Sequence, residues 1–386
     1  MRKKILFILL LFQASVSLAG DIVKIGVFTK STIKAFILTT STGAYDVVAD
    51  GNVVTQLQKN GVLQVYLKDG KIGVKTFSDE VGEFGELYLK KRQWGSSFRI
   101  KTTIPNLEER QYYDDLIIKK KANAFKLINK VYIEHYVAGV VESEAGSKQS
   151  LEYYKVQSII CRTYALSKLS RHIEEEYNLC DRVHCQVYHS KSRFNADIPK
   201  ATNATKGMVL VDSDINLITA SFHSNCGGQT LNAEDVWKYP VPYLKSVCDT
   251  FCSGQRHSYW EKKIPTNSWL SYLSKKYNYP IQDSAHNSIA LTHAPDYRIG
   301  FLSSDSLVRL TRLRKDWKLW STYFSLEQQQ DSVLLKGNGF GHGVGLCQEG
   351  AMKMADLGKS FTDILHFYYK DVHLVDLSAL DFFREE

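Results

Sequence analysis

Short stretches of alternating hydrophobic and polar residues fill the chain from residue 20 to about residue 105. Ile22–Phe28, Ile33–Leu38 and Val62–Leu67 are rich in β-branched and aromatic residues, which favour β-strands. Dipeptides typical of β-hairpin turns lie around these stretches, namely Asp50-Gly51, Asn60-Gly61 and Asp69-Gly70. The pattern predicts a small antiparallel β module over residues 20–105. Because no cluster of catalytic residue types lies in it, we expect a structural or binding element.

After residue 105 the hydrophobic spacing changes from that of strands to that of helices. The charged segment 108–121 is predicted as a helix or a linker, and Lys130–Ile133 as the end of a strand. One face of the next helix carries Tyr136, Val137, Val140 and Val141. Glycine commonly ends helices, so this helix is expected to stop before Gly146.

A second helix is predicted shortly afterwards, with Ser147 or Ser150 as its N-cap. Its apolar face carries Val156, Ile159, Ile160 and Thr163. Segment 260–330 reads as short strands and loops. Near the C-terminus we expect a helix over Glu349–Leu357 closed by Gly358, and a capping box at Ser360–Asp363 that starts another. Strands followed by helices predict an α+β fold.

The N-terminus has the three parts of a signal peptide, over residues 1–19. Arg2, Lys3 and Lys4 form the charged part, Ile5–Phe12 the apolar part, and Ser17-Leu18-Ala19 the small-residue cleavage site. The alternative is a buried first strand or helix. We expect an exported mature chain, periplasmic or cell-wall associated, without a membrane span, because no later stretch is long and apolar enough.

Charge and cysteine count restrict the classes of partner. The net charge is +8, and the signal residues carry part of it, so a mild excess remains that suits either an anionic polymer or a solubilising surface. No basic run interleaved with aromatic residues occurs, which argues against nucleic acid. The chain has seven cysteines. This odd number leaves at least one as a free thiol or a metal ligand.

Three separated motifs carry the chemistry. They are Val140–Gly146 with Gln157–Tyr164 after it, Ser224-Asn-Cys-Gly-Gly-Gln-Thr230, and the glycine-rich segment Gly339–Ala351. In this order they resemble the stage II sporulation protein D / amidase enhancer (SpoIID/LytB) family, over roughly residues 112–375. The resemblance implies a mixed α/β catalytic domain, which we place at 106–378. Sporulation members of this family are lytic transglycosylases that cut peptidoglycan glycan strands.

The resemblance makes Glu144 the expected acid/base. Breaking a glycosidic bond needs a proton for the leaving oxygen, and burial can keep a carboxylic acid protonated. Ordinary glycosidases pair two carboxylates. A lytic transglycosylase needs one, because the C6 hydroxyl of the reacting muramic acid attacks intramolecularly. Glu142 is the nearest competitor, and without the resemblance Glu144 would read as a helix-end or surface residue.

The resemblance also implies a set of polar and glycine contacts to the glycan. Arg162 and Tyr164 are two residues apart on a helix and therefore point different ways, one toward a groove and one toward the core. The alternative for Arg162 is a structural role. The alternative for the two glycine-rich segments is that they form tight turns packed on a core. Many family members carry Ser and Tyr where this chain has Cys347 and Glu349. The expected substrate-binding residues are Gln157, Arg162, Tyr164, Ser224, Gly228, Thr230, His342 and Gln348.

A group of histidines and cysteines lies between the motifs. Some family members bind zinc there through two Cys and two His, and the match here is His172, Cys180, His184 and Cys185. We favour a structural zinc site, with a disulfide involving Cys180 or Cys185 as the alternative. Cys248 and Cys252 could pair with each other or with Cys226. No cofactor is expected to be required for catalysis.

These observations predict a peptidoglycan lytic transglycosylase that leaves 1,6-anhydro-MurNAc ends. Family members of this type prefer glycan stripped of stem peptides, which makes an N-acetylmuramoyl-L-alanine amidase the expected partner. A glycan-binding modulator that stimulates such an amidase is the alternative. A zinc hydrolase built on Cys180, His184 and Cys185 is a third interpretation, and a closed set of two Cys and two His speaks against it.

Overall fold

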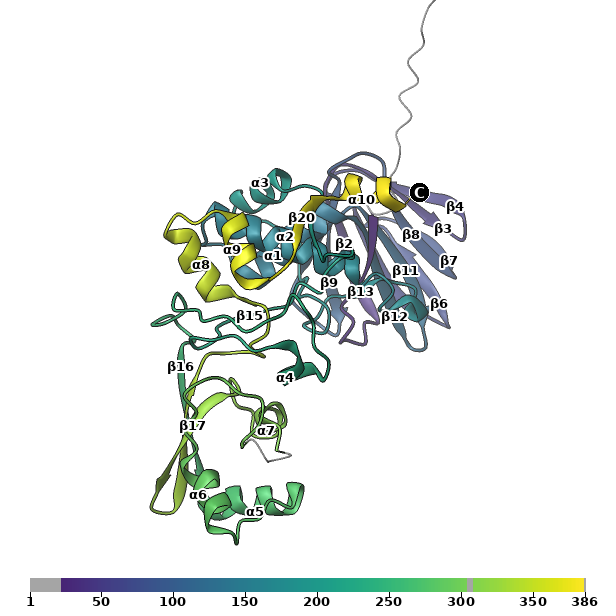
Figure 1. Ribbon diagram of the computed structural model, residues 1–386. Helices are drawn as coiled ribbons and strands as arrows, with labels where there is room; N and C mark the ends of the chain where they lie inside the picture. The colour runs from purple at the N-terminus through teal and green to yellow at the C-terminus, as the bar shows by residue number, and fades with distance from the viewer. Residues whose placement is uncertain (1–21, 304–307, 385–386) are drawn as a thin grey trace, which may run out of the picture.

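The computed structural model describes residues 22–303 and 308–384 (Figure 1). The predicted signal peptide lies outside these residues. Within the described ranges, none of the helices has the length and apolar character needed to cross a membrane.

Two β-sheets make up the N-terminal part of the molecule. One has seven strands in the order β13 (Leu179–Cys180), β1 (Ile22–Val27), β12 (Ala124–Tyr132), β11 (Asp115–Lys121), β8 (Glu86–Lys91), β3 (Tyr45–Ala49) and β4 (Asn52–Leu57). The other has six, in the order β10 (Arg110–Tyr113), β9 (Ser97–Ile104), β2 (Ala35–Thr42), β5 (Val62–Lys68), β6 (Lys71–Lys75) and β7 (Glu80–Phe84). Neighbouring strands are antiparallel except β1 and β13.

Two of the three predicted hairpin turns form hairpins. Asp50-Gly51 joins β3 to β4 and Asp69-Gly70 joins β5 to β6, with positive φ at all four residues. Asn60-Gly61 is different, because it leads from β4 in one sheet to β5 in the other. The chain crosses here between two sheets that share one core, so a turn dipeptide alone did not identify the strand pairing.

Strands of the two sheets continue past residue 105, the predicted end of the β module, to Tyr132. Segment 108–121, predicted as a helix or linker, contains the whole of β10 and β11, which extend the two sheets. Leu116 and Ile118 are buried in the shared core, while the lysines that follow lie at the end of the strand. The alternating apolar positions therefore outweighed the charge of the segment.

Helices pack beside the sheets and share their hydrophobic core. Figure 1 shows them grouped at one side of the β-sheets. As predicted, α1 ends at Gly146, Ser150 caps α2, and Ser360 and Asp363 form a capping box. The α+β prediction is confirmed. This layer contains α1 (Ile133–Ala145), α2 (Leu151–Ser167), α3 (Asp197–Ala204), α8 (Gln348–Asp356) and α9 (Phe361–Tyr368), with the strand pair β14 (Met208–Val211) and β20 (His373–Asp376), followed by α10 (Leu377–Arg384).

A lobe with its own core extends from this body (Figure 1). It contains β16 (Tyr259–Pro265), α5 (Thr266–Tyr277), α6 (Ser284–Thr292), α7 (Leu310–Asp316), β17 (Tyr323–Gln329) and β18 (Ser332–Asn338). The prediction of short strands and loops missed its helices. Only two residues of α5, Trp269 and Leu273, are fully buried, which is too few to give a clear helical period. In the sequence, β15 (Phe222–His223) precedes the lobe and β19 (Leu346–Cys347) follows it. These two short strands pair in parallel.

Candidate functional site

A groove of about 470 Å³ lies where the end of α1, the 183–186 loop, β15 and the glycine-rich segment meet. It brings together residues as far apart in the sequence as Glu144 and Gln348. Its walls include Glu144, Tyr164, Val183, His184, Cys185, Ser224, Trp237, Arg314, Phe340, His342 and Gln348.

Glu144 occupies the last turn of α1 and faces the groove. Its Oε1 accepts a hydrogen bond of 2.8 Å from the backbone N–H of Val187. Burial raises the pKa of the carboxyl above its ordinary value, and the hydrogen bond from Val187 opposes this only in part. Among the described residues that line the groove, Glu144 is the only carboxylate.

Glu142 points elsewhere, although it is only two residues from Glu144. Its carboxylate accepts hydrogen bonds from the Ser192 hydroxyl at 3.0 Å and from the backbone N–H groups of Arg193 and Phe194 at 3.0 and 2.9 Å. These bonds fix the loop that precedes α3. The structure therefore separates the two candidate acids: Glu144 lies in the groove, and Glu142 holds the loop before α3.

Three of the predicted contacts from the later motifs line the groove: Ser224, His342 and Gln348. The Gln348 side chain donates to the backbone oxygen of Glu144 at 3.5 Å. His342 Nδ1 accepts from the N–H of Val344 at 3.1 Å, so its Nε2–H donates to the Phe222 oxygen at 2.9 Å. Burial lowers the pKa of His342 to about 4. A neutral imidazole with both nitrogens engaged holds the glycine-rich segment against β15.

The predicted divergence of Arg162 and Tyr164 is confirmed. Tyr164 lines the groove, whereas the Arg162 side chain is fully buried and pairs with Glu134 through two hydrogen bonds, one of 2.8 Å from Nε. Arg162 also donates to the Met208 oxygen at 3.0 Å. A side chain without exposed surface cannot contact a glycan, so the predicted binding role of Arg162 is wrong and its role is structural.

The predicted binding roles of Gln157 and Thr230 are also wrong, because both side chains are fully buried. Gln157 accepts from the Tyr153 hydroxyl at 3.1 Å, and the Thr230 hydroxyl accepts from the N–H of Val247 at 2.8 Å. Gly228 lies outside the groove lining, and its oxygen accepts from the N–H of Asp249. The Ser224–Thr230 motif thus reaches the groove at its first residue and packs inside the protein at its last.

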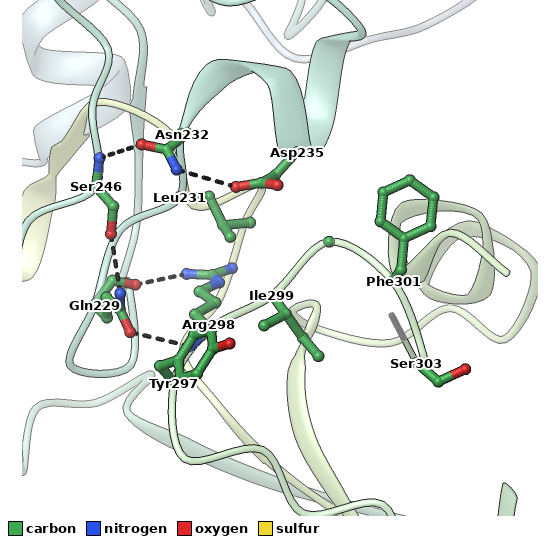
Figure 2. Close-up of a pocket in the computed structure, with 11 residues that line it drawn as sticks. Gln229, Leu231, Asn232, Asp235, Ser246, Tyr297, Arg298, Ile299, Phe301 and Ser303 are labelled. Atoms are coloured by element: carbon green, nitrogen blue, oxygen red, sulfur yellow. Dashed lines mark hydrogen bonds between the residues drawn. The ribbon is translucent and has the colours of Figure 1, made fainter. Parts of the chain in front are cut away.

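Gln229, the second-last residue of that motif, borders a second cavity, of about 430 Å³, between the body and the lobe. Figure 2 shows its polar side chains engaged with one another. Gln229 accepts from the backbone N–H of Arg298 at 3.0 Å and donates to Ser246 at 3.0 Å, while Asn232 accepts from the N–H of Ser246 at 2.9 Å. The bond between Arg298 and Gln229 connects the lobe to the body at a place distinct from the groove.

Two glycines explain how the glycine-rich segment approaches β15. Both Gly341 and Gly345 have positive φ, at 118° and 72°. A Cβ at Gly341 would lie 2.8 Å from the Cβ of His223, and one at Gly345 would lie 2.2 Å from the oxygen of Ser221. Only glycine fits this backbone and this separation.

The predicted metal ligands meet beside the groove. One ligand atom from each of His172, Cys180, His184 and Cys185 lies within 4.8 Å of the other three. Cys185 Sγ is 3.7 Å from His184 Nδ1, and Cys180 Sγ is 3.9 Å from the same atom. A turn closed by the N–H of Cys185 and the oxygen of Arg182 brings these neighbours together. His184 and Cys185 also line the groove.

Comparison with known proteins identifies the family. The family profile described as SpoIID, stage II sporulation protein, matches residues 121–211. A stage II sporulation protein D of Bacillus amyloliquefaciens is 31% identical over 278 residues, which are 66% of this chain and 77% of that protein. The chain belongs to the SpoIID/LytB family.

Other SpoIID/LytB relatives differ in how much of their length is matched. An uncharacterized protein of Brachyspira hyodysenteriae is 27% identical over 344 residues, 88% of each chain. An amidase enhancer of Bacillus subtilis is 25% identical over 390 residues, which are 85% of this chain and 54% of the enhancer. The names of the two Bacillus relatives refer to sporulation and to the enhancement of an amidase.

Glu349, where many SpoIID/LytB members carry Tyr, does not add a second carboxylate to the groove. Its Oε1 lies 2.5 Å from His257 Nδ1, and its Oε2 accepts from the Asn225 amide at 2.6 Å. The side chain thus joins α8 to the start of the lobe. This departure leaves the single-carboxylate character of the groove unchanged.

Sequence reasoning missed several groove residues, among them His223, Trp237, Arg314 and Phe340. His223 and Phe340 lie directly beside or inside the motifs and could have been found there. Trp237 comes from α4 (Ala233–Trp237) and Arg314 from α7 of the lobe. No local pattern marks these two, because only the tertiary fold brings them to the groove.

Proposed function

We propose that this protein is a peptidoglycan lytic transglycosylase that cleaves the MurNAc–GlcNAc bond and leaves 1,6-anhydro-MurNAc ends, with Glu144 as acid and base. The observation that carries the proposal is a groove whose only carboxylate, among the described residues, has a raised pKa. A hydrolase of the usual kind would need a second carboxylate to activate water or to attack the sugar.

One carboxyl group suffices for the non-hydrolytic reaction. Protonated Glu144 gives its proton to the O4 leaving oxygen of GlcNAc as the bond from C1 of MurNAc breaks. The C6 hydroxyl of the same MurNAc then attacks C1 and returns its proton to Glu144. The new C1–O6 bond closes the anhydro ring without water, and the tethered hydroxyl supplies a large effective concentration. The acid is regenerated within one turnover.

The groove walls suit a glycan. Trp237 and Phe340 are 40% and 37% exposed, and aromatic faces stack well on sugar C–H groups. Arg314 is the only arginine that lines the groove within the described residues. Because Arg162 is buried, we assign to Arg314 the contact with the anionic lactyl group of MurNAc.

The His172, Cys180, His184 and Cys185 cluster fits a structural zinc ion. His172 Nδ1 lies 3.2 Å from Glu175, and within the described residues its buried Nε2 has no hydrogen-bond partner, which leaves this atom for a metal. Four protein ligands would close the coordination shell, as in structural zinc sites, and leave no position for a catalytic water. The zinc would hold the 183–186 loop, which forms one wall of the groove.

Export follows from the same proposal, because peptidoglycan lies outside the cytoplasmic membrane. Residues 1–19 would direct it there. The preference of such enzymes for peptide-stripped strands makes a cell-wall amidase the expected partner.

Two variants test the assignment of Glu144. Mature protein, Glu144→Gln and Glu142→Gln are incubated with peptide-stripped peptidoglycan, and the release of soluble glycan is measured below the unfolding temperature of each protein. General acid catalysis typically contributes about 10²–10⁴-fold, so Glu144→Gln should lose at least about 100-fold while Glu142→Gln keeps most activity. Equal loss in both variants, or none in Glu144→Gln, would reject Glu144 as the acid.

A second function is favoured by one relative, the Bacillus subtilis amidase enhancer. In that case the groove binds glycan and the protein stimulates an amidase without cutting. The amidase would be assayed on peptidoglycan with wild-type protein and with Glu144→Gln. Full stimulation by the variant, together with no cleavage by the wild type, would select the modulator function.

A further inference from the structure

Four buried side chains from three separate segments converge behind the groove: Cys226, Asp249, Cys252 and Cys347. One ligand atom of each lies within 4.8 Å of the other three, and all four residues have 0% exposure. We propose that they form a second metal site, a closed structural Zn²⁺ site with three thiolates and one carboxylate. It is distinct from the His172 cluster and does not depend on the proposed reaction.

The distances suit a metal better than a disulfide. Cys226 Sγ lies 3.4 Å from Cys252 Sγ and 3.2 Å from Asp249 Oδ2. In a tetrahedral site with Zn–S bonds of about 2.3 Å, two sulfurs lie about 3.8 Å apart. A disulfide would need them at about 2.05 Å. It would also join only two of the three thiols and leave the other beside a buried carboxylate.

Asp249 gives a second, independent reason. Its carboxyl is fully buried, and in the described ranges no lysine, arginine or histidine pairs with it. Burying a charge is costly unless it is paired or binds a metal. The partners of Asp249 are Cys226, the Tyr368 hydroxyl, which donates to Oδ2 at 2.9 Å, and the N–H of Phe251, which donates to Oδ1 at 2.9 Å.

The groups around the cluster resemble the outer shell of a thiolate site. Cys347 Sγ accepts from the N–H of Cys226 at 3.2 Å and from the N–H of Gly350 at 3.4 Å. N–H donors of this kind stabilise metal-bound thiolates, and the donors to Asp249 orient the carboxylate. The guanidinium of Arg298 donates to the Cys226 oxygen at 2.7 Å, which places a positive charge next to an anionic site.

The site would connect the two glycine-rich motifs. Cys226 lies two residues after Ser224, and Cys347 is the N-cap of α8 directly before Gln348. Asp249 and Cys252 come from the loop that packs behind both. Three loops with little secondary structure would thus be fixed by one ion, and the binding free energy would add directly to the stability of the fold.

Metal content tests the proposal. The full mature chain is purified from zinc-supplemented medium, and zinc per chain is measured by inductively coupled plasma mass spectrometry in wild type, Cys226→Ser, Asp249→Asn, Cys180→Ser and Cys248→Ser. Cys248 is an exposed neighbour outside the cluster and serves as the matched control. Cys226→Ser and Asp249→Asn should each lose one zinc relative to wild type. Cys248→Ser should lose none, and Cys180→Ser should still hold the zinc of the second site.

If Cys226→Ser or Asp249→Asn does not fold, Co²⁺ binding to the wild-type protein tests the site instead. Co²⁺ loaded into wild-type protein should give the sulfur-to-cobalt charge-transfer band of a tetrahedral thiolate site, and part of that band should remain in Cys180→Ser. The proposal is overturned if Cys180→Ser holds no metal, or if Asp249→Asn holds as much as wild type. It is also overturned if alkylation without reduction recovers Cys226 and Cys252 as a disulfide.

Discussion

At the residue scale, Glu144 and Glu142 are predicted to respond in opposite ways to the same substitution. Burial raises the pKa of Glu144 in the folded state, so the folded protein holds this proton more tightly than the unfolded chain. The resulting stabilisation is fully present below the unfolded pKa and is lost as pH rises through the folded pKa. Glu144→Gln should therefore raise Tm near neutral pH, and the gain should disappear below about pH 4.

Glu142→Gln should be less stable than wild type at neutral pH, because a neutral amide replaces a carboxylate that accepts from Ser192, Arg193 and Phe194. Loss of such bonds costs about 1–3 kcal/mol. Thermal unfolding of both variants across pH checks this. Destabilisation by Glu144→Gln at neutral pH would contradict the raised pKa and with it the role of a protonated acid.

The buried pair of Arg162 and Glu134 gives a second prediction at this scale. Arg162→Met leaves Glu134 buried without its partner, which should cost about 3–5 kcal/mol. Adding Glu134→Leu should recover most of that loss, because both charges are then gone. Urea unfolding of the single and double variants measures the two values. A small effect of Arg162→Met on stability, with a large effect on glycan binding, would indicate that Arg162 contacts the substrate after all.

At the scale of elements, the end of α1 is predicted to depend on one glycine. Gly146 has φ 73° and ψ −174°, a region that is essentially restricted to glycine and costs other residues about 1–3 kcal/mol. An added Cβ would touch nothing within 4 Å, so the cost of Gly146→Ala comes from the backbone alone. Gly146→Ala should lose stability, and it should also lose glycan cleavage because Glu144 is two residues away.

Gly358→Ala is the matched control for this prediction. Gly358 also follows a helix with positive φ and open space around its Cβ position, but it is not part of the groove lining. Its substitution should lower Tm with cleavage retained below Tm. Equal activity of the two variants would mean that the end of α1 does not set the position of the acid.

Local signals predicted the elements around the groove well. The helix before Gly146, the Ser150 cap and the Ser360–Asp363 capping box follow from spacing and capping chemistry alone. Segment 108–121 was misread because its lysines and acids hide an alternating apolar pattern. The helices of the lobe were missed because they bury few residues each, so their periodicity is weak.

At the scale of the whole molecule, the groove could be predicted only in part. The motifs placed Glu144, Ser224, His342 and Gln348 in one site, and the structure brings them together. The structure also shows that Arg162, Gln157 and Thr230 belong to these motifs but are buried inside the protein. Arg314 and Trp237 reach the groove from the lobe and from α4. Their positions depend on contacts between distant segments, which a single sequence does not display.

Metal removal is predicted to act on the whole molecule. A strong chelator should lower Tm and reduce cleavage together, and zinc should restore both, because both proposed sites hold loops around the groove. Near-ultraviolet circular dichroism, Tm and product release would be followed on one sample. Loss of cleavage with unchanged Tm and spectrum would indicate a catalytic metal instead.

The mass of the released products tests the central proposal most directly. Mature protein is incubated with peptide-stripped peptidoglycan, and the soluble saccharides are analysed by mass spectrometry beside Glu144→Gln. We expect disaccharides with 1,6-anhydro-MurNAc ends, one water lighter than reducing disaccharides, and none from the variant. Reducing ends would mean hydrolysis, and no product from folded protein that still binds glycan would mean that the protein is a modulator rather than an enzyme.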